Sequence, residues 1–139
     1  FVEDIRSAVS IPILSILEET SKFLKEKKVN KVGIVATPIT IRNKLYEKFL
    51  KKKKIKQIIP DKFQQAKIGR LIHNLVSDRY SNKDREVLIK MIQDFSKSKV
   101  KYVILACTDL QLLMPKTRGI KIYDTMKILA DATVKNIIK

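Results

Sequence analysis

One segment combines an apolar strand pattern with side chains that could take part in chemistry. The apolar run 103–106 ends at Cys107, the only cysteine of the chain, and Thr108 and Asp109 follow directly. In an open α/β sheet, ligands bind outside the carboxyl ends of the strands, so this thiol would face a crevice. A helix that begins at Thr108 would favour the thiolate, which predicts a lowered pKa and a usable base near neutral pH. A lone cysteine at a strand end can equally be a small apolar core residue.

Composition limits the class of protein. With 139 residues, of which 45% are hydrophobic, the chain is expected to form a single folded domain over residues 1–139. One cysteine and one histidine offer neither an internal disulfide nor a metal cluster. This cysteine usage fits a reducing, cytoplasmic compartment. No apolar run approaches the roughly 18 residues of a membrane span, so we expect no membrane association.

The formal net charge of +16 raises the hypothesis of a nucleic-acid partner. Most of the cations are lysines, they are scattered over several expected helices, and aromatic residues that could stack on bases make up only 6% of the chain. The four-lysine run 51–54 falls at the end of an expected helix, where cations complement the dipole. The sequence therefore disfavours nucleic acid, and the positive field would serve as well to attract a small dicarboxylate.

Helical and strand periods alternate along the chain. This alternation predicts an α/β fold, an open and mostly parallel sheet with helices on both faces. The predicted helices cover residues 1–9, 15–28, 40–54, 61–80, 82–97, 110–114 and 125–138, and the predicted strands cover residues 11–14, 31–36, 56–59, 102–106 and 120–123. Asp61 and Asn82 are predicted to cap the helices that begin there. Helix 1–9 has neither a Met nor a capping residue before it, so we expect further chain upstream.

Six segments occur in a characteristic order. They are Ile-Pro-Ile-Leu-Ser-Ile at 11–16, Val-Gly-Ile-Val-Ala-Thr-Pro-Ile-Thr at 32–40, Leu-Tyr at 45–46, Ile-Ile-Pro at 58–60, Cys-Thr-Asp-Leu at 107–110 and Asp-Thr at 124–125. This series resembles the C-terminal portion of the aspartate/glutamate racemase family, most of all its aspartate racemases. The resemblance implies an isomerase that acts on a small acidic amino acid, aspartate or glutamate. It also implies that the protein works without pyridoxal phosphate, metal or any other cofactor.

The resemblance assigns roles to five residues. In the family, two similar α/β lobes enclose the active site and each supplies one cysteine, and Cys107 matches the cysteine of the C-terminal lobe. One thiolate removes the Cα proton while the other thiol protonates the opposite face. Thr37 and Thr40 match a hydroxyl-bearing turn, and Thr108 matches the residue after the cysteine, which suits them to a substrate carboxylate; Thr40 can equally be a helix N-cap. Asp109 stands where the family usually has Glu and where glutamate racemases favour His, which favours aspartate.

The chain also departs from the family pattern. The glycine-rich opening and the Cys-Asn-Thr segment of the family's first lobe have no counterpart here. We therefore expect one lobe of the two-lobe fold, which associates with a first lobe encoded elsewhere or with a second copy as a homodimer. The alternative is a non-catalytic remnant or an anion-binding module. His73 lies outside the motifs and is expected to be a surface or core residue, and Asp124 is expected to cap the last helix.

Overall fold

A four-stranded parallel sheet organises the computed structural model, which describes residues 2–138. The strands are β1 (Lys31–Val35), β2 (Lys56–Ile58), β3 (Tyr102–Leu105) and β4 (Lys121–Asp124), in the order β2-β1-β3-β4. All three pairings are parallel, so the sheet has one amino edge and one carboxyl edge. These four strands lie within one residue of the predicted ones at each end.

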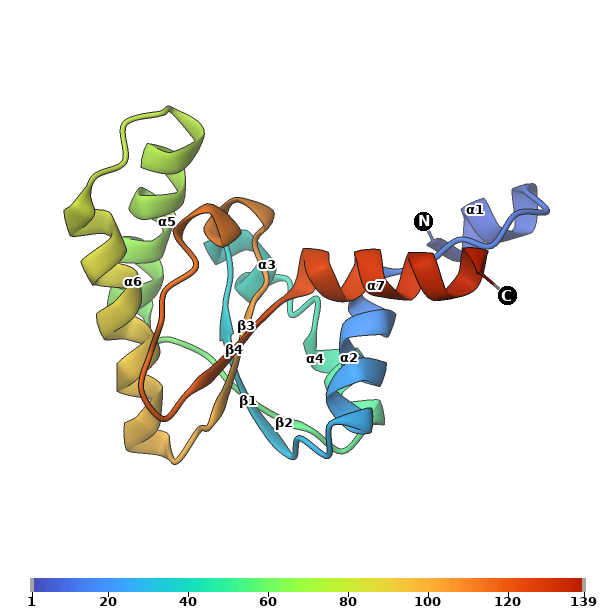
Figure 1. Ribbon diagram of the computed structural model, residues 1–139, viewed down its shortest axis with the longest axis horizontal. Coiled ribbons are helices and arrows are strands. Elements are labelled where there is room, and N and C mark those ends of the chain that lie inside the picture. The colour runs from blue at the N-terminus through green and yellow to red at the C-terminus, as the bar shows by residue number, and fades with distance from the viewer. Residues whose placement is uncertain (1, 139) are drawn as a thin grey trace.

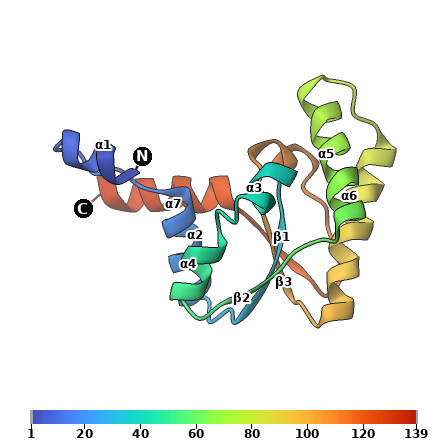
Figure 2. The same cartoon turned by 180° about the vertical axis from the view of Figure 1, so that it is seen from behind.

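Helices cover both faces of the sheet, as predicted (Figure 1). The α-helices are α1 (Val2–Ala8), α2 (Ile16–Glu26), α3 (Pro38–Arg42), α4 (Glu47–Lys52), α5 (Lys62–Val76), α6 (Asn82–Asp94) and α7 (Thr125–Ile137), and two 3-10 helices are η1 (Phe95–Ser98) and η2 (Thr108–Leu113). Seen from behind, α5 and α6 lie on one side of the sheet and α2 and α4 on the other (Figure 2). Phe1, the first residue of the predicted helix 1–9, lies outside the described residues.

Strand side chains alternate between two apolar cores. Val35, Val103 and Leu105 belong to a core with α5 and α6, whereas Ile34 and Ile104 belong to a core with α2 and α4. All five residues are at most 1% exposed. Because both faces of the central strands are buried, β1 and β3 appear in the sequence as continuous apolar runs.

Polar caps fix where the long helices begin. The Asp61 carboxylate accepts a hydrogen bond of 2.8 Å from the Gln64 N–H, and the Gln64 side chain accepts one from the Asp61 N–H, which confirms the predicted cap. Helix α6 is capped one residue earlier than predicted. Ser81 is its N-cap, and the Ser81 N–H donates to the Asp84 carboxylate across 2.8 Å. Asn82 is therefore the first helical residue.

The predicted strand 11–14 is wrong. These residues form an irregular loop before α2, and Ile11 is 66% exposed. Pro12 has no N–H to give to a strand ladder. Pro12 and Leu14 instead line a cavity together with Leu129 and Ile137 of α7, so this apolar run serves helix packing.

The predicted single helix 40–54 is two helices. Lys44 has a positive φ of 52° between α3 and α4, which no helix can continue through. The break turns Tyr46 into the core with α2 and α4, where it is 5% exposed. Leu45, which a single helix would bury beside Ile41, is instead 44% exposed.

Helix α7 extends away from the sheet past α2 (Figure 1). Ile128 in its first half is buried, whereas Ile137 near its end is 77% exposed. At the other end of the chain, the Arg6 guanidinium donates to the Glu18 carboxylate at 2.7 Å and to the Ile13 carbonyl at 2.8 Å. These bonds fasten α1 to the start of α2.

Candidate functional site at the carboxyl edge of the sheet

Cys107 lies where the sequence predicts it, just beyond the carboxyl end of β3. The Ala106 N–H donates to the Val35 carbonyl at 2.8 Å, so pairing with β1 continues one residue past the strand. Cys107 is extended (φ −130°, ψ 127°) and precedes η2 directly. Its side chain is 8% exposed and joins the core with α5 and α6. The thiol is thus at the boundary between the core and the edge of the sheet.

The surroundings of the thiol raise its pKa, so the predicted lowering is wrong. Burial is the main cause, because it disfavours the charged thiolate. The backbone N–H groups of Asp109 and Leu110, at the start of η2, lower the pKa of the thiol as expected for a helix start. The Asp109 carboxylate raises that pKa and so acts against them. The Cys107 thiol donates to Asp109 Oδ2 across 3.7 Å. At neutral pH, Cys107 is therefore a thiol that is already paired with a carboxylate.

Thr37 and Thr40 form a hydroxyl pair at the end of β1. Thr37 is the N-cap of α3 and accepts from the Thr40 N–H at 3.2 Å, so the predicted cap at Thr40 is three residues too late. Pro38 takes the first helical position, which suits its fixed φ. The two hydroxyl oxygens are 2.8 Å apart. One hydroxyl donates to the other, which leaves one hydroxyl proton for another acceptor.

Sheet register relates Thr37 to Cys107. Val35 pairs with Leu105, so Thr37 and Cys107 each stand two residues beyond a paired position on neighbouring parallel strands. Strands are about 4.8 Å apart, so these two residues leave the sheet side by side at the same edge. Thr108, exposed at the start of η2, and half-buried Asp109 follow at this edge.

Thr125 lies at this edge and belongs to one of the six characteristic segments, although the sequence assigned it no role. Its hydroxyl donates to the Leu105 carbonyl at 2.9 Å, and the residue is only 1% exposed. The bond holds the last residue of β3, two positions before Cys107, against the start of α7. Asp124 caps α7 as predicted by accepting from the Met126 N–H. The available signal was a hydroxyl residue directly after a predicted capping Asp.

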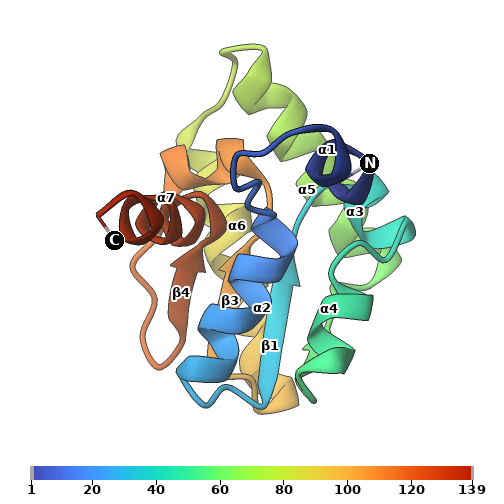
Figure 3. The ribbon, with the colours of Figure 1, turned by 90° about the vertical axis from the view of Figure 1, so that its right-hand side faces the viewer.

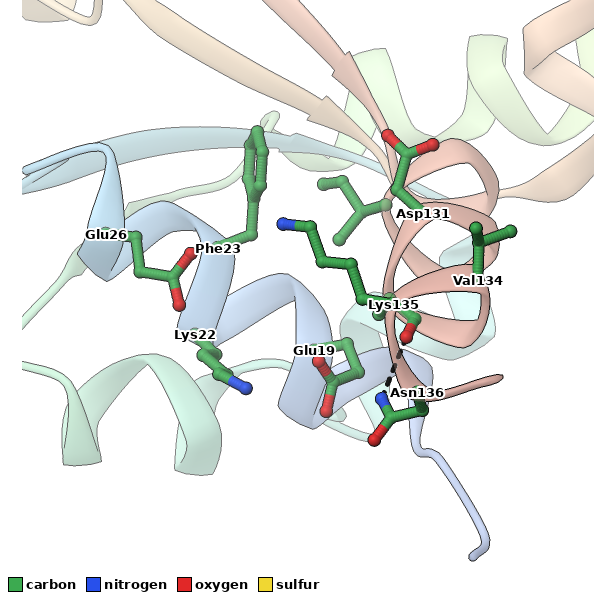
Figure 4. Close-up of a pocket in the computed structure, with 10 residues that line it drawn as sticks. Glu19, Lys22, Phe23, Glu26, Asp131, Val134, Lys135 and Asn136 are labelled. Carbon is green, nitrogen blue, oxygen red and sulfur yellow. Dashed lines mark hydrogen bonds between the residues drawn. The ribbon is translucent and has the colours of Figure 1, made fainter. Parts of the chain in front are cut away.

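Other polar or hollow places lie away from this edge. His73 is an exposed residue of α5, 3.4 Å from an Arg79 nitrogen, as its place outside the motifs suggested. A cavity of about 450 Å³ lies between α2 and α7, where Lys135 extends from α7 toward Phe23 of α2 (Figure 4). Within residues 2–138, no group of three or more His, Cys, Asp and Glu side chains could hold a metal ion. No helix of that same range is long and apolar enough to cross a membrane.

A parallel α/β sheet with a cysteine at its carboxyl edge fits the family that the sequence suggested. Residues 1–133 match the family model for Asp/Glu/Hydantoin racemases. The chain therefore belongs to the Asp/Glu/hydantoin racemase family.

Individual members of the family are similar to nearly the whole chain. It is 29% identical over 139 residues to the broad specificity amino-acid racemase RacX of Bacillus subtilis (strain 168), which covers 99% of this chain and 60% of RacX. The structure of an aspartate racemase homologue from Pyrococcus horikoshii OT3 matches with a TM-score of 0.87 at 21% identity, over 99% of this chain and 61% of that one. The Picrophilus torridus aspartate racemase matches with a TM-score of 0.75 at 27% identity, over 88% and 52%. The chain thus spans about 60% of the length of the curated relative that it matches.

Proposed function

We propose that this chain is the Cys107-bearing lobe of a cofactor-independent amino-acid racemase of the cytoplasm, with aspartate as substrate. The observation that carries the proposal is the place of Cys107: the chain's only thiol stands at the carboxyl edge of the sheet, in register with Thr37 on the neighbouring strand. The similarity to RacX and to the Picrophilus aspartate racemase supports an amino acid as the substrate.

The reaction needs two proton-transfer groups on opposite faces of the substrate. One thiolate takes the Cα proton and leaves a planar carbanion, and a thiol on the other side gives its proton to the opposite face. A single group that returned its proton to the same face would not invert the centre. Residues 1–139 contain one cysteine, so a group from another lobe or another copy completes the pair.

The raised pKa supports the role of proton donor for Cys107 in the resting protein. A protonated thiol is the form that donates, so in the resting protein Cys107 is the acid and the opposing group is the base. After one turnover Cys107 is a thiolate, and the reverse reaction uses it as the base. Asp109, 3.7 Å from the sulfur, receives the thiol hydrogen bond in the resting state and is the residue that orients it.

The hydroxyl groups of the edge are suited to the substrate carboxylates. The spare hydroxyl proton of the Thr37–Thr40 pair and the exposed hydroxyl of Thr108 can each donate to a carboxylate oxygen. Thr37 and Thr108 belong to turns that leave neighbouring strands, so a small dicarboxylate could contact both.

The raised pKa also favours a second candidate, an anion-binding module that does not turn over substrate. A thiol that stays protonated and paired with Asp109 performs no proton abstraction by itself. The hydroxyl groups of the carboxyl edge would still bind an anion.

A complementation experiment separates the two candidates. The chain is incubated with L-aspartate in D2O, alone and with the amino-terminal lobe of an aspartate racemase, while NMR follows loss of the Cα proton and a chiral assay follows D-aspartate. We expect exchange and inversion only in the mixture, a loss of about 100-fold or more for Cys107→Ala, and unchanged rates for His73→Ala. Exchange that survives Cys107→Ala contradicts the racemase proposal. Aspartate binding without exchange in any mixture supports the binding module.

A further inference from the structure

The amino edge of the sheet, opposite the candidate site, gathers lysines from four separate parts of the sequence. Each strand begins at a lysine or directly after one: Lys31, Lys56, Lys101 and Lys121. Further lysines immediately precede β1, β2 and β3. The thirteen lysines of this set, which we name the lysine edge, are Lys25, Lys27, Lys28, Lys31, Lys51, Lys52, Lys53, Lys54, Lys56, Lys97, Lys99, Lys101 and Lys121. Figure 3 shows the amino ends of β1, β3 and β4 and the ends of α2 and α4 toward the lower side.

Hydrogen bonds show that the four segments are adjacent. The Lys56 N–H donates to the Asn30 carbonyl and the Lys121 N–H to the Lys101 carbonyl, at 2.9 and 2.8 Å. The Lys31 ammonium donates to the Ser98 carbonyl at 3.1 Å, which connects the segment before β1 to the segment before β3. Residues scattered over about a hundred positions of sequence thus form one continuous row.

A residue in the left-handed conformation stands two or three positions before every strand. Lys28, Lys54 and Lys99 have φ of 56°, 58° and 55°, and Gly119 has φ 77° at the corresponding place before β4. Glycine is the usual residue in this left-handed conformation, because a Cβ there is sterically unfavourable. Three of the four turns nevertheless carry a lysine, so charge is present here at a conformational cost.

The residue after each left-handed position is apolar and buried. Val29, Ile55, Val100 and Ile120 are between 2% and 7% exposed. The segments 25–31, 51–56, 97–101 and 118–121 contain no aromatic residue. The lysine edge therefore presents ammonium groups and backbone, with no apolar or aromatic side chain of these segments available to a partner.

Few carboxylates neutralise the lysine edge. Lys51 pairs with Glu47 at 2.9 Å and Lys97 with Asp94 at 2.6 Å, and Glu26 lies between Lys25 and Lys27 in the sequence. Lysines at the carboxyl end of a helix interact favourably with the helix dipole. This accounts for only one or two of the lysines at the end of α2 and of α4. The excess is a concentrated positive field along one side of the molecule.

We propose that the lysine edge binds the phosphate backbone of double-stranded nucleic acid without sequence preference. Charge complementarity carries the proposal, because a duplex offers about one negative charge per 1.7 Å and lysines along a row can contact several phosphates. The rings beside the edge, Phe23 and Tyr123, pack against each other and lie beneath the Lys27 and Lys121 ammonium groups. This disfavours single strands, which are bound by stacking on free rings. The burial of every apolar residue of these segments leaves no apolar face to insert, so a membrane surface would be held by charge alone. The sequence disfavoured nucleic acid because its cations are scattered, are mostly lysines and are accompanied by few aromatic residues. The topology removes the first objection, and the other two weigh against base recognition and single strands rather than against duplex phosphates.

The test measures binding of a labelled 20-base-pair duplex by fluorescence anisotropy between 50 and 200 mM salt. The variant Lys28→Gly, Lys54→Gly, Lys99→Gly removes three charges at positions whose backbone conformation glycine prefers, so its fold is preserved. The control variant Arg79→Ala, Lys83→Ala, Lys135→Ala removes three exposed charges outside the lysine edge. We expect the triple-glycine variant to lose about tenfold or more in affinity at 100 mM salt and to flatten the slope of log K against log salt by about 1 to 3.

Three results would overturn the proposal. The first is an equal loss of affinity in the two variants, which would mean that net charge alone binds the duplex. The second is tighter binding to phosphatidylserine vesicles, and the third is tighter binding to polyglutamate, which would assign the edge to a membrane or to an acidic protein. This binding measurement does not depend on aspartate turnover. Its outcome is therefore independent of the proposed racemase activity.

Discussion

The thiol of Cys107 donates a hydrogen bond to Asp109 two residues later, across 3.7 Å between Sγ and Oδ2. A carboxylate so close to a thiol stabilises the protonated form and repels the thiolate. Burial acts in the same direction and is the larger cause. The sequence motif Cys-Thr-Asp thus encodes a proton donor in this chain, whereas the motif alone suggested a base.

The pH dependence of alkylation checks this protonation state. We expect the rate of iodoacetamide labelling to rise with an inflection above that of the same thiol in the urea-unfolded chain, because burial raises the pKa of Cys107. The variant Asp109→Asn removes the repelling charge and should move the inflection to lower pH. An inflection at or below the unfolded value would contradict the structure. The chain has one cysteine, so no other thiol contributes to the signal.

The chain by itself should not racemise aspartate. Its single thiol can serve only one face of the substrate, so neither D- nor L-aspartate should invert above the buffer rate. A chiral assay on both enantiomers at high protein concentration measures this. Robust turnover that disappears in Cys107→Ala would show that two copies of the chain bring two Cys107 thiols to one site. Sedimentation of the same sample would then show a dimer.

The bond between Arg6 and Glu18 should fasten α1 only above acidic pH. The Arg6 guanidinium lowers the pKa of Glu18 by hydrogen bonding, so the attachment is complete above the ordinary Glu range and is lost as the pH falls through the lowered folded pKa. We expect faster hydrogen exchange of α1 amides at neutral pH in Arg6→Ala. Arg70→Ala, an exposed residue of α5, is the control. Equal exchange in the two variants would mean that packing alone holds α1.

Gly33 of β1 leaves room for the Phe95 ring. A Cβ at Gly33 would lie 2.9 Å from Phe95 Cδ1 and 3.0 Å from Cε1, closer than atoms pack. We expect Gly33→Ala to lower the free energy of unfolding by about 1 to 3 kcal/mol, as overpacked cores do. Urea unfolding measures this. The double variant Gly33→Ala, Phe95→Leu should lose less than the two single changes together, and strict additivity would contradict the contact.

The exposed apolar side chains near the chain ends should find a partner. Ile5 of α1 is 46% exposed and Ile137 of α7 is 77% exposed, although Ile128 is buried within the chain. Apolar surface costs about 25 cal/mol per Å² when it stays in water, so we expect self-association or binding to another lobe at micromolar concentration. Sedimentation in moderate salt, where the repulsion from the +16 charge is screened, measures it. A protein that stays monomeric and binds no hydrophobic dye would mean that the exposed apolar side chains of α1 and α7 do not form a binding surface.

The sequence was sufficient where one local rule decides the structure. The sheet was predictable because β1 and β3 are buried on both faces and therefore continuous apolar runs. The position of Cys107 followed from the end of such a run. Asp61 was predictable as a cap because its partner Gln64 is three residues away. In each case the deciding contacts lie within a few residues of each other.

The sequence was insufficient where distant contacts decide. Loop 11–14 has a strand-like composition, but α7, more than a hundred residues later, is what it packs against. The pKa of Cys107 depends on burial, which local sequence does not report. The lysine edge exists only because parallel strands begin at the same side of the sheet. None of these features has a signal within a single window of sequence.

The short outer strand β2 has a consequence for the behaviour of the protein in concentrated solution. It has only three residues, begins at Lys56, and is followed closely by Pro60. An exposed sheet edge invites other chains to add strands, and a short edge that carries lysine and is closed by proline offers little to add to. The sheet should therefore resist edge-to-edge aggregation through β2.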